Sequence, residues 1–105
     1  MIAALGMYDR PETAKANDRF WQAICDHLAD TPDTPVALTR GGDPSQIWRD
    51  PALLFSQTCG MPYRTRLHGK VQIVGTPDYG LPDSASGQYY SVLIRRPGDR
   101  RELQA

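Results

Sequence analysis

The sequence predicts a single α/β domain with a mostly parallel sheet and helices on both of its faces. Three observations predict this class. The chain has 105 residues, which is the length of one domain. Hydrophobic residues make up 40% of it and charged residues 23%, which is typical of a folded chain and not of a disordered one. Short apolar runs alternate with segments of helical periodicity, an order typical of parallel strands joined by right-handed crossovers.

Net charge and cysteine usage exclude several classes of partner. The chain holds 12 basic and 12 acidic residues, so its formal charge is zero and gives no attraction toward nucleic acid or an acidic membrane surface. No stretch approaches the ~18 consecutive apolar residues of a membrane span. Cys25 and Cys59 are too few for a disulfide framework and lack the spacing of metal ligands. We therefore expect no metal and no cofactor.

The first part of the chain is predicted to form a strand, a helix and a second strand. Residues 2–7 are an apolar run with no basic residue before it, so we interpret them as a strand and not as a secretory signal. Proline and acidic residues at 9–12 favour a helix start. The helix then carries an apolar stripe of Phe20, Ile24 and Leu28, with Trp21 and Cys25 beside it. Prolines at 31–35 end this helix, and residues 36–39 are predicted to be a short strand.

The second part repeats the same alternation. Asp43 is placed to cap a short helix that begins at Pro44 and turns Ile47 and Trp48 inward. Leu53–Ser56 is a buried strand, and a helix follows from Pro62 to residue 66 or 67. Residues 71–76 and 89–95 are predicted strands on either side of a long loop, 77–87. We expect one lobe over residues 1–96 and a polar tail over 97–105.

In open α/β sheets, ligands bind beyond the carboxyl ends of the strands. The most informative loop there is the turn that contains Thr58, Cys59 and Gly60 and leads into the helix at Pro62. The free N–H groups of a first helical turn favour an anion, and glycine lets the backbone approach it closely. Pro62 has no N–H, so the donors are expected from residues 58–61. A plain strand-to-helix turn without a ligand is the alternative, and the spacing leaves both open.

Several aromatic residues are candidates for the same site. Tyr8 follows the first strand and offers a phenolic donor, and Tyr63 is similar. On the last predicted strand, Tyr90 points to one face, while Ser91 points to the other, and the sequence does not choose which face is the site. We interpret Trp21 and Trp48 as core residues because each shares a helical stripe with other apolar residues.

Enzymatic use of Cys59 is a further alternative. A thiol at a helix N-terminus has a lowered pKa, and His68 lies downstream as a conceivable base. No acid stands where it would orient that base, and we interpret His27 and His68 as solvated surface residues. We therefore expect no catalytic residue. The arginines near the end of the chain are interpreted as a solvated run and not as a nucleic-acid surface.

Four segments resemble the phosphate- and phosphonate-type substrate-binding proteins of ABC importers, which are two-lobed type II periplasmic binding proteins. The segments are MYDRPE (7–12), QTCGMPY (57–63), VGTP (74–77) and GQYYSV (87–92). Their order is more specific than any one of them. The resemblance covers residues 1–96 and implies one lobe of that fold.

The resemblance implies that the lobe binds a small oxyanion without chemistry and presents it to a transporter permease outside the cytoplasm. Tyr8 would be the rim aromatic, Thr58, Cys59 and Gly60 the helix-terminus donors, and Tyr90 and Ser91 the donors before the hinge, with Tyr63 a weaker member. Sulfonates and thiamine precursors are alternative ligands of the same fold class. The family's second lobe has no counterpart in these 105 residues, so the chain is either a fragment of a two-lobed protein or a truncated relative whose other half comes from a partner or a dimer. An interaction domain with no small ligand is the third class of function.

Overall fold

The computed structural model describes residues 1–101. These residues group into two compact units, Met1–Gln72 and a second one that begins at Ile73. All the regular secondary structure of the described residues lies in the first unit. The predicted division into a lobe at 1–96 and a tail at 97–105 stays a prediction.

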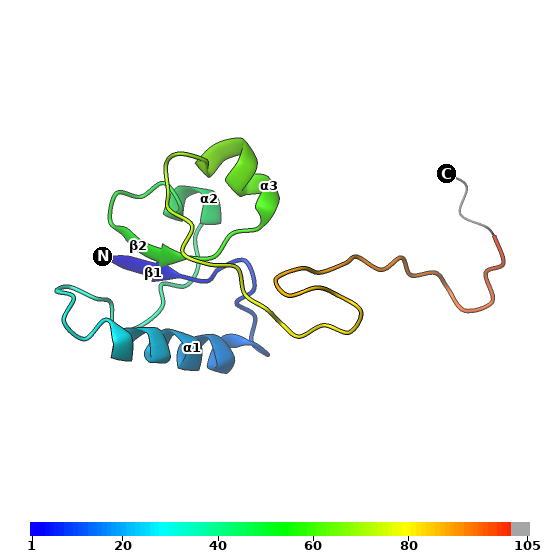
Figure 1. Cartoon of the computed structure of the whole chain (residues 1–105), viewed down its shortest axis with the longest axis horizontal. Helices are drawn as coiled ribbons and strands as arrows, with labels where there is room; N and C mark the ends of the chain where they lie inside the picture. Colours follow the sequence, from blue (N-terminus) through cyan, green and yellow to red (C-terminus); the bar gives the residue numbers. More distant parts are fainter. Residues whose placement is uncertain (102–105) are drawn as a thin grey trace. The chain divides into compact units, whose positions relative to one another are not determined.

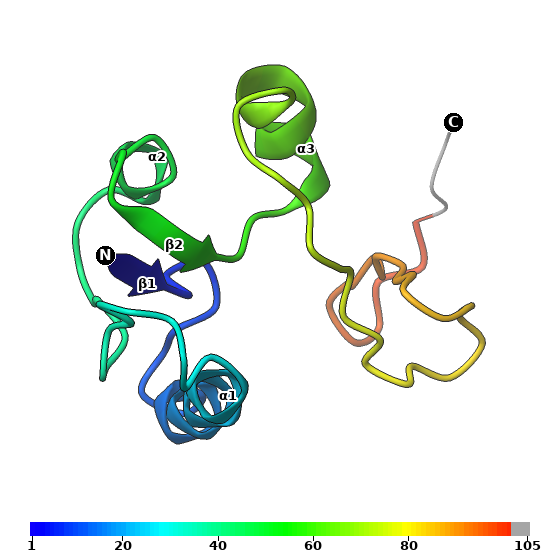
Figure 2. The same cartoon turned by 60° about the vertical axis from the view of Figure 1, so that its left-hand side comes forward.

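Two short parallel strands form the centre of the first unit. β1 (Ile2–Ala4) pairs with β2 (Leu53–Ser56) in parallel, with Ile2 opposite Leu53 and Ala4 opposite Ser56. A hydrogen bond from Ser56 Oγ to the carbonyl oxygen of Ala4 (2.6 Å) ties the two strands together at their carboxyl ends. Helix α1 lies on one side of the strand pair, and helices α2 and α3 lie on the other (Figures 1 and 2). The coarse prediction of an α/β chain with parallel strands is thereby confirmed.

The core lies between the strands and α1 (Ala14–His27). Trp21 is 2% exposed, stacks on Phe55 with ring centroids 5.8 Å apart, and donates its indole N–H to the carbonyl oxygen of Pro35 at 3.0 Å. Ala3, Leu5 and Leu38 complete the buried cluster. The predicted apolar stripe of α1 is therefore its packed face, except that Phe20 is 53% exposed at the edge of Phe55.

Two short helices follow in chain order. α2 (Pro44–Ile47) begins as predicted, because the carboxylate of Asp43 accepts a hydrogen bond from the Ser45 backbone N–H at 2.9 Å. α3 (Gly60–Pro62) continues directly into η1 (Tyr63–Leu67), a π-helical turn that buries Leu67. The predicted helix to residue 67 is confirmed, with its start two residues earlier than expected.

Three predicted strands were wrong. Residues 36–39 make one sheet-like hydrogen bond, from the Thr39 N–H to the Ala3 carbonyl (2.7 Å), and then reach Gly41 and Gly42, whose positive φ angles of 80° and 83° turn the chain away. Residues 71–76 and 89–95 have no strand partner within the described part of the chain. The β-propensity of apolar, β-branched residues expresses pairing and burial, and without a partner these segments stay irregular.

The second unit is held by its own turns over the residues described. The Asp78 carboxylate accepts hydrogen bonds from the Gly80 N–H (2.9 Å) and the Ser86 hydroxyl (2.8 Å), and these bonds lower the pKa of Asp78. Asp83 and Gly87 take positive φ angles of 56° and 72° on either side of Ser86. This loop is the one predicted for residues 77–87.

Candidate functional site

The candidate site lies at the carboxyl ends of β1 and β2. Because the strands are parallel, the loop after β1, which carries Tyr8, and the turn after β2, which carries Thr58, Cys59 and Gly60, leave the sheet at the same end (Figure 1). The structure therefore supports the predicted placement of these four residues at one edge. Tyr90 and Ser91 belong to the second unit, where they lie in an irregular segment and not on a strand.

The turn after β2 is held in place by α2. The indole N–H of Trp48, the residue that ends α2, donates to the carbonyl oxygen of Gln57 at 3.2 Å. Trp48 is half-buried and does not belong to the buried cluster around Trp21, so the prediction of a core residue holds for Trp21 and not for Trp48, which supports the turn. The Asp43 cap fixes the start of α2, and α2 in turn fixes Gln57, which is the residue before Thr58.

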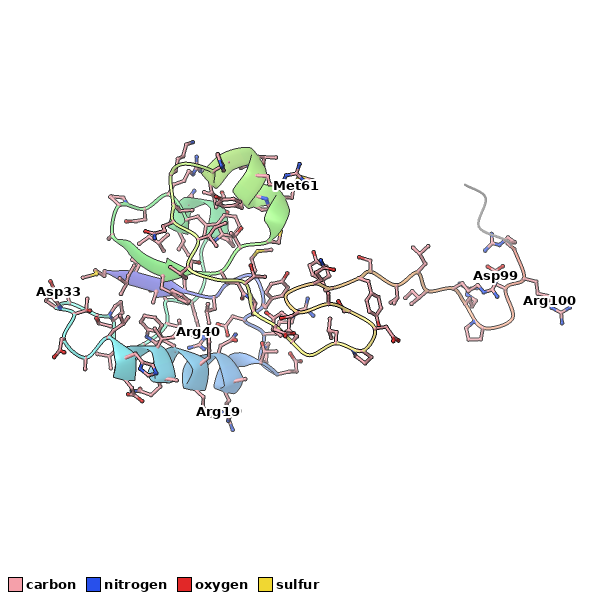
Figure 3. The ribbon with its side chains drawn as sticks, viewed as in Figure 1. Arg19, Asp33, Arg40, Met61, Asp99 and Arg100 are labelled. Carbon is pink, nitrogen blue, oxygen red and sulfur yellow. The ribbon has the colours of Figure 1, made fainter. Side chains whose placement is uncertain are left out.

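Cys59 is the residue before α3, with an extended backbone (φ −87°, ψ 170°) and no side-chain hydrogen bond to the helix. The next two N–H groups, those of Gly60 and Met61, have no hydrogen-bond acceptor within residues 1–101. Both residues are exposed; Met61 is 69% exposed, and its side chain stands on the outside of α3 (Figure 3). Two adjacent donors are thus directed away from the helix and are accessible to a ligand.

The side chains around this turn are less accessible to a ligand than the two backbone N–H groups. The Thr58 hydroxyl donates weakly to the Cys59 carbonyl oxygen at 3.3 Å, and Thr58 is half-buried. Tyr63 begins η1, is half-buried, and meets His68 edge-on with ring centroids 5.8 Å apart. Within the described residues no hydrogen bond joins Cys59 to a histidine. The backbone N–H groups are therefore the best-presented donors of the turn.

The loop after β1 is braced around Tyr8. The Tyr8 backbone N–H donates to the Leu5 carbonyl (3.2 Å), and its own carbonyl accepts from the Thr13 hydroxyl at 2.6 Å. That hydroxyl also accepts the Arg10 N–H at 2.9 Å. The side chain of Tyr8 is 48% exposed on this fixed backbone. A phenol held in this way can act as a rim residue without being part of the core.

An ion cluster next to Tyr8 was missed by the sequence analysis. Arg40 bridges two carboxylates, with Nε 2.6 Å from Asp9 and Nη2 2.7 Å from Asp18, and its side chain lies along α1 (Figure 3). The Asn17 amide donates to Asp9 at 2.9 Å. The Asn17 hydrogen bond lowers the pKa of Asp9, burial opposes this, and Arg40 lowers it further. The cluster joins the loop after β1 to α1 and to the segment after Leu38.

A signal for this cluster was present in the sequence. Asp9 lies just beyond the first strand and Arg40 just beyond the predicted strand at 36–39, so both belong to the loops at the carboxyl ends. The sequence did not show that these two residues pair, because they are 31 positions apart and only the fold brings them together.

Two surface depressions lie elsewhere. One, of about 510 Å³, is formed by residues near the end of the described chain: Ile94, Arg95, Arg96, Asp99 and Arg101. The guanidinium of Arg101 is already paired with Asp99. The other, of about 330 Å³, lies between the end of α1 and the loop at 31–36. Neither is lined by a predicted site residue.

Comparison with known proteins adds no assignment, since no family model, curated protein or solved structure matches the chain. None of the helices in residues 1–101 is long and apolar enough to cross a membrane. Within the same residues, histidines, cysteines and acidic residues form no group of three that could hold a metal ion. The fold and site define a small α/β chain with two parallel strands and an open turn at their carboxyl ends.

Proposed function

We propose that this chain is one lobe of a binding protein for a small oxyanion of the phosphate or phosphonate type. The observation that carries the proposal is the pair of N–H groups on Gly60 and Met61, which are exposed and have no acceptor within the described residues. Two adjacent backbone donors suit two oxygens of one tetrahedral anion. The resemblance of residues 57–63 to phosphonate-type binding proteins supports the same assignment.

The environment of the turn favours an anion over a neutral ligand. The helical segment that starts at Gly60 has no acidic residue in its first turn; its arginines, Arg64 and Arg66, lie in the last turn, and the charge of Arg66 acts on the Asp43 carboxylate. Asp9, the carboxylate nearest to Tyr8 along the chain, is paired with Arg40, which Asp18 shares. The aligned peptide dipoles add a partial positive charge at Gly60. An oxyanion at this turn therefore meets backbone donors and no carboxylate from residues 57–67.

The remaining roles follow from the resemblance. Tyr8 is the rim aromatic, Thr58 and Cys59 flank the donors, and Tyr63 is a weaker member. Tyr90 and Ser91 are further donors that the resemblance implies. In this proposal the chain binds without chemistry, works outside the cytoplasm, and delivers its ligand to an ABC importer permease. A second lobe supplies the opposite wall of the cleft, so the isolated chain binds weakly.

A thermal-shift screen tests the proposal. Phosphate, methylphosphonate, sulfate and methanesulfonate are each compared at millimolar concentration with the neutral analogue dimethyl sulfone. A ligand that binds only the folded chain raises its melting temperature by mass action. The proposal expects a selective rise with one tetrahedral oxyanion and none with the sulfone. Equal rises with every anion would indicate a general salt effect, and no rise with any of them would refute the lobe as a binding unit.

A further inference from the structure

The second unit contains a strand-length apolar segment that the chain leaves uncovered. Residues 89–94, with the sequence YYSVLI, include no charged side chain. Tyr89 is 72% exposed, Val92 69%, Leu93 79% and Ile94 91%. Between the turn bond of Gln88 and that of Asp99, the described residues make no backbone hydrogen bond. Within residues 1–101, the apolar side chains of this segment are therefore exposed, and its backbone groups make no hydrogen bond to other backbone groups.

The first unit presents an edge of matching kind. β1 has β2 on one side, and on its other side it accepts the Thr39 N–H at 2.7 Å. β2 has β1 on one side only, and within the described residues no strand pairs with its outer edge, where the Leu53 N–H donates to the Asp50 carbonyl oxygen at 3.0 Å. Its residues Leu53–Ser56 are half-buried, as expected of a strand with one covered side. An open strand edge is a template for pairing with another chain.

We propose that two copies of this chain pair reciprocally, with residues 89–94 of each copy adding as a strand to the outer edge of β2 in the other. The proposal does not rest on oxyanion binding. A two-fold arrangement lets each copy give one segment and receive one, so that both exposed segments are covered at once. Strand addition satisfies the backbone groups through hydrogen bonds, and the alternate side chains find apolar contact.

The area agrees with a stable pair. Three aliphatic side chains and one tyrosine at these exposures offer about 300 Å² of apolar surface per segment. Two segments and the two surfaces that receive them then bury about 1,200 Å², which reaches the lower limit of stable protein interfaces. The formal charge of the chain is zero, so two copies do not repel one another. A second copy of the chain is the partner proposed for residues 89–94, because it provides the outer edge of β2 on which they can pair.

The test is the mass of the 105-residue chain in solution, measured by light scattering or sedimentation between low and high micromolar concentration. The proposal expects a concentration-dependent rise from one chain to two. A chain that stays monomeric over this range refutes it, and so does growth beyond two copies, which indicates open-ended pairing. Oxyanion binding is measured separately from the mass. A chain that binds an oxyanion and stays monomeric refutes only the dimer, and a dimer that binds no oxyanion refutes only the proposed function.

Variants locate the interface. Leu93→Pro keeps an apolar side chain but removes the N–H and blocks strand addition, so it should be a monomer at concentrations where the parent is a dimer. The matched control is Val36→Asp, which places a charge on another side chain that is 91% exposed and should keep the dimer. Trp21 and Trp48 lie in the first unit, so their fluorescence verifies that the unit that holds β2 is folded in both variants. A Leu93→Pro variant that dimerises like the parent contradicts the proposal.

Discussion

Replacing Gly60 tests the proposed donors one at a time. Gly60 is the first residue of α3, a position that tolerates proline well, and the extended backbone of Cys59 (ψ 170°) is the conformation that a following proline requires. An added Cβ at Gly60 meets no atom within 4 Å. Gly60→Pro therefore removes one N–H and leaves the fold intact. Gly60→Ala is the matched control, because it stiffens the backbone and keeps the donor.

The size of the effect follows from the bond that is lost. A hydrogen bond to a charged group contributes about 1.5–3 kcal/mol. In a turn where Gly60 and Met61 are the two free donors, losing one should weaken oxyanion binding by about 10- to 150-fold. Gly60→Ala should stay within about threefold of the parent, since no atom stands in the way of its methyl group.

Isothermal titration with methylphosphonate measures both variants, and their melting temperatures without ligand verify that each is folded. The expected order of affinity is parent, then Gly60→Ala close behind, then Gly60→Pro far weaker. If Gly60→Pro binds as tightly as Gly60→Ala, the backbone N–H of residue 60 contributes nothing and the assignment of the anion to this turn is wrong. If both variants lose binding equally, the loss reflects backbone freedom and not the donor.

Three further predictions concern the scaffold that holds the site. Trp21→Ala should lower the free energy of unfolding, measured with urea, by about 3–5 kcal/mol. This is a large part of the total of about 4–11 kcal/mol that is typical of a unit of 72 residues. The control Arg19→Ala, on the exposed face of α1, should change the free energy of unfolding by less than about 0.5 kcal/mol. The pKa of Asp9 is lowered in the folded chain, so the ionised carboxylate stabilises the fold above about pH 4, its unfolded pKa, and this stabilisation disappears as the pH falls through the folded pKa. The urea midpoint of the Asp9→Asn variant should therefore change less between about pH 5 and 3 than that of the parent. If the two curves of urea midpoint against pH run parallel, Asp9 does not contribute. Asp43→Ala should lower the melting temperature by removing the α2 cap, while Asp43→Asn keeps an acceptor and should retain most of it; equal losses would mean that the charge and not the hydrogen bond stabilises α2.

Local chemistry was readable from the sequence. The bounds of β2 agree with the prediction because Leu53–Ser56 is an apolar run between turn residues. The Asp43 cap with Pro44 behind it gave the start of α2 for the same reason. The start of α1 was less well placed: the Thr13 hydroxyl bonds to Tyr8 and Arg10, so residues before Ala14 form turns and the helix begins later than Pro11.

Properties that depend on distant partners were not readable. Residues 71–76 and 89–95 have the composition of strands, but a strand forms only where another one lies beside it. The bridge from Arg40 to Asp9 and Asp18 joins positions 31 and 22 apart in sequence, and no local pattern selects that pair. For the candidate site, the turn at 58–60 was found because glycine and a following helix are local signals. Its support by Trp48 emerged only from the packing of α2.

The most direct test of the account is a titration of the ¹⁵N-labelled chain with methylphosphonate, followed by the backbone amide signals. The account predicts saturable shifts that are largest at Gly60 and Met61, smaller at Thr58 and Cys59, and absent with dimethyl sulfone. Saturable binding that leaves Gly60 and Met61 unmoved while other amides shift would place the ligand elsewhere and contradict the central claim.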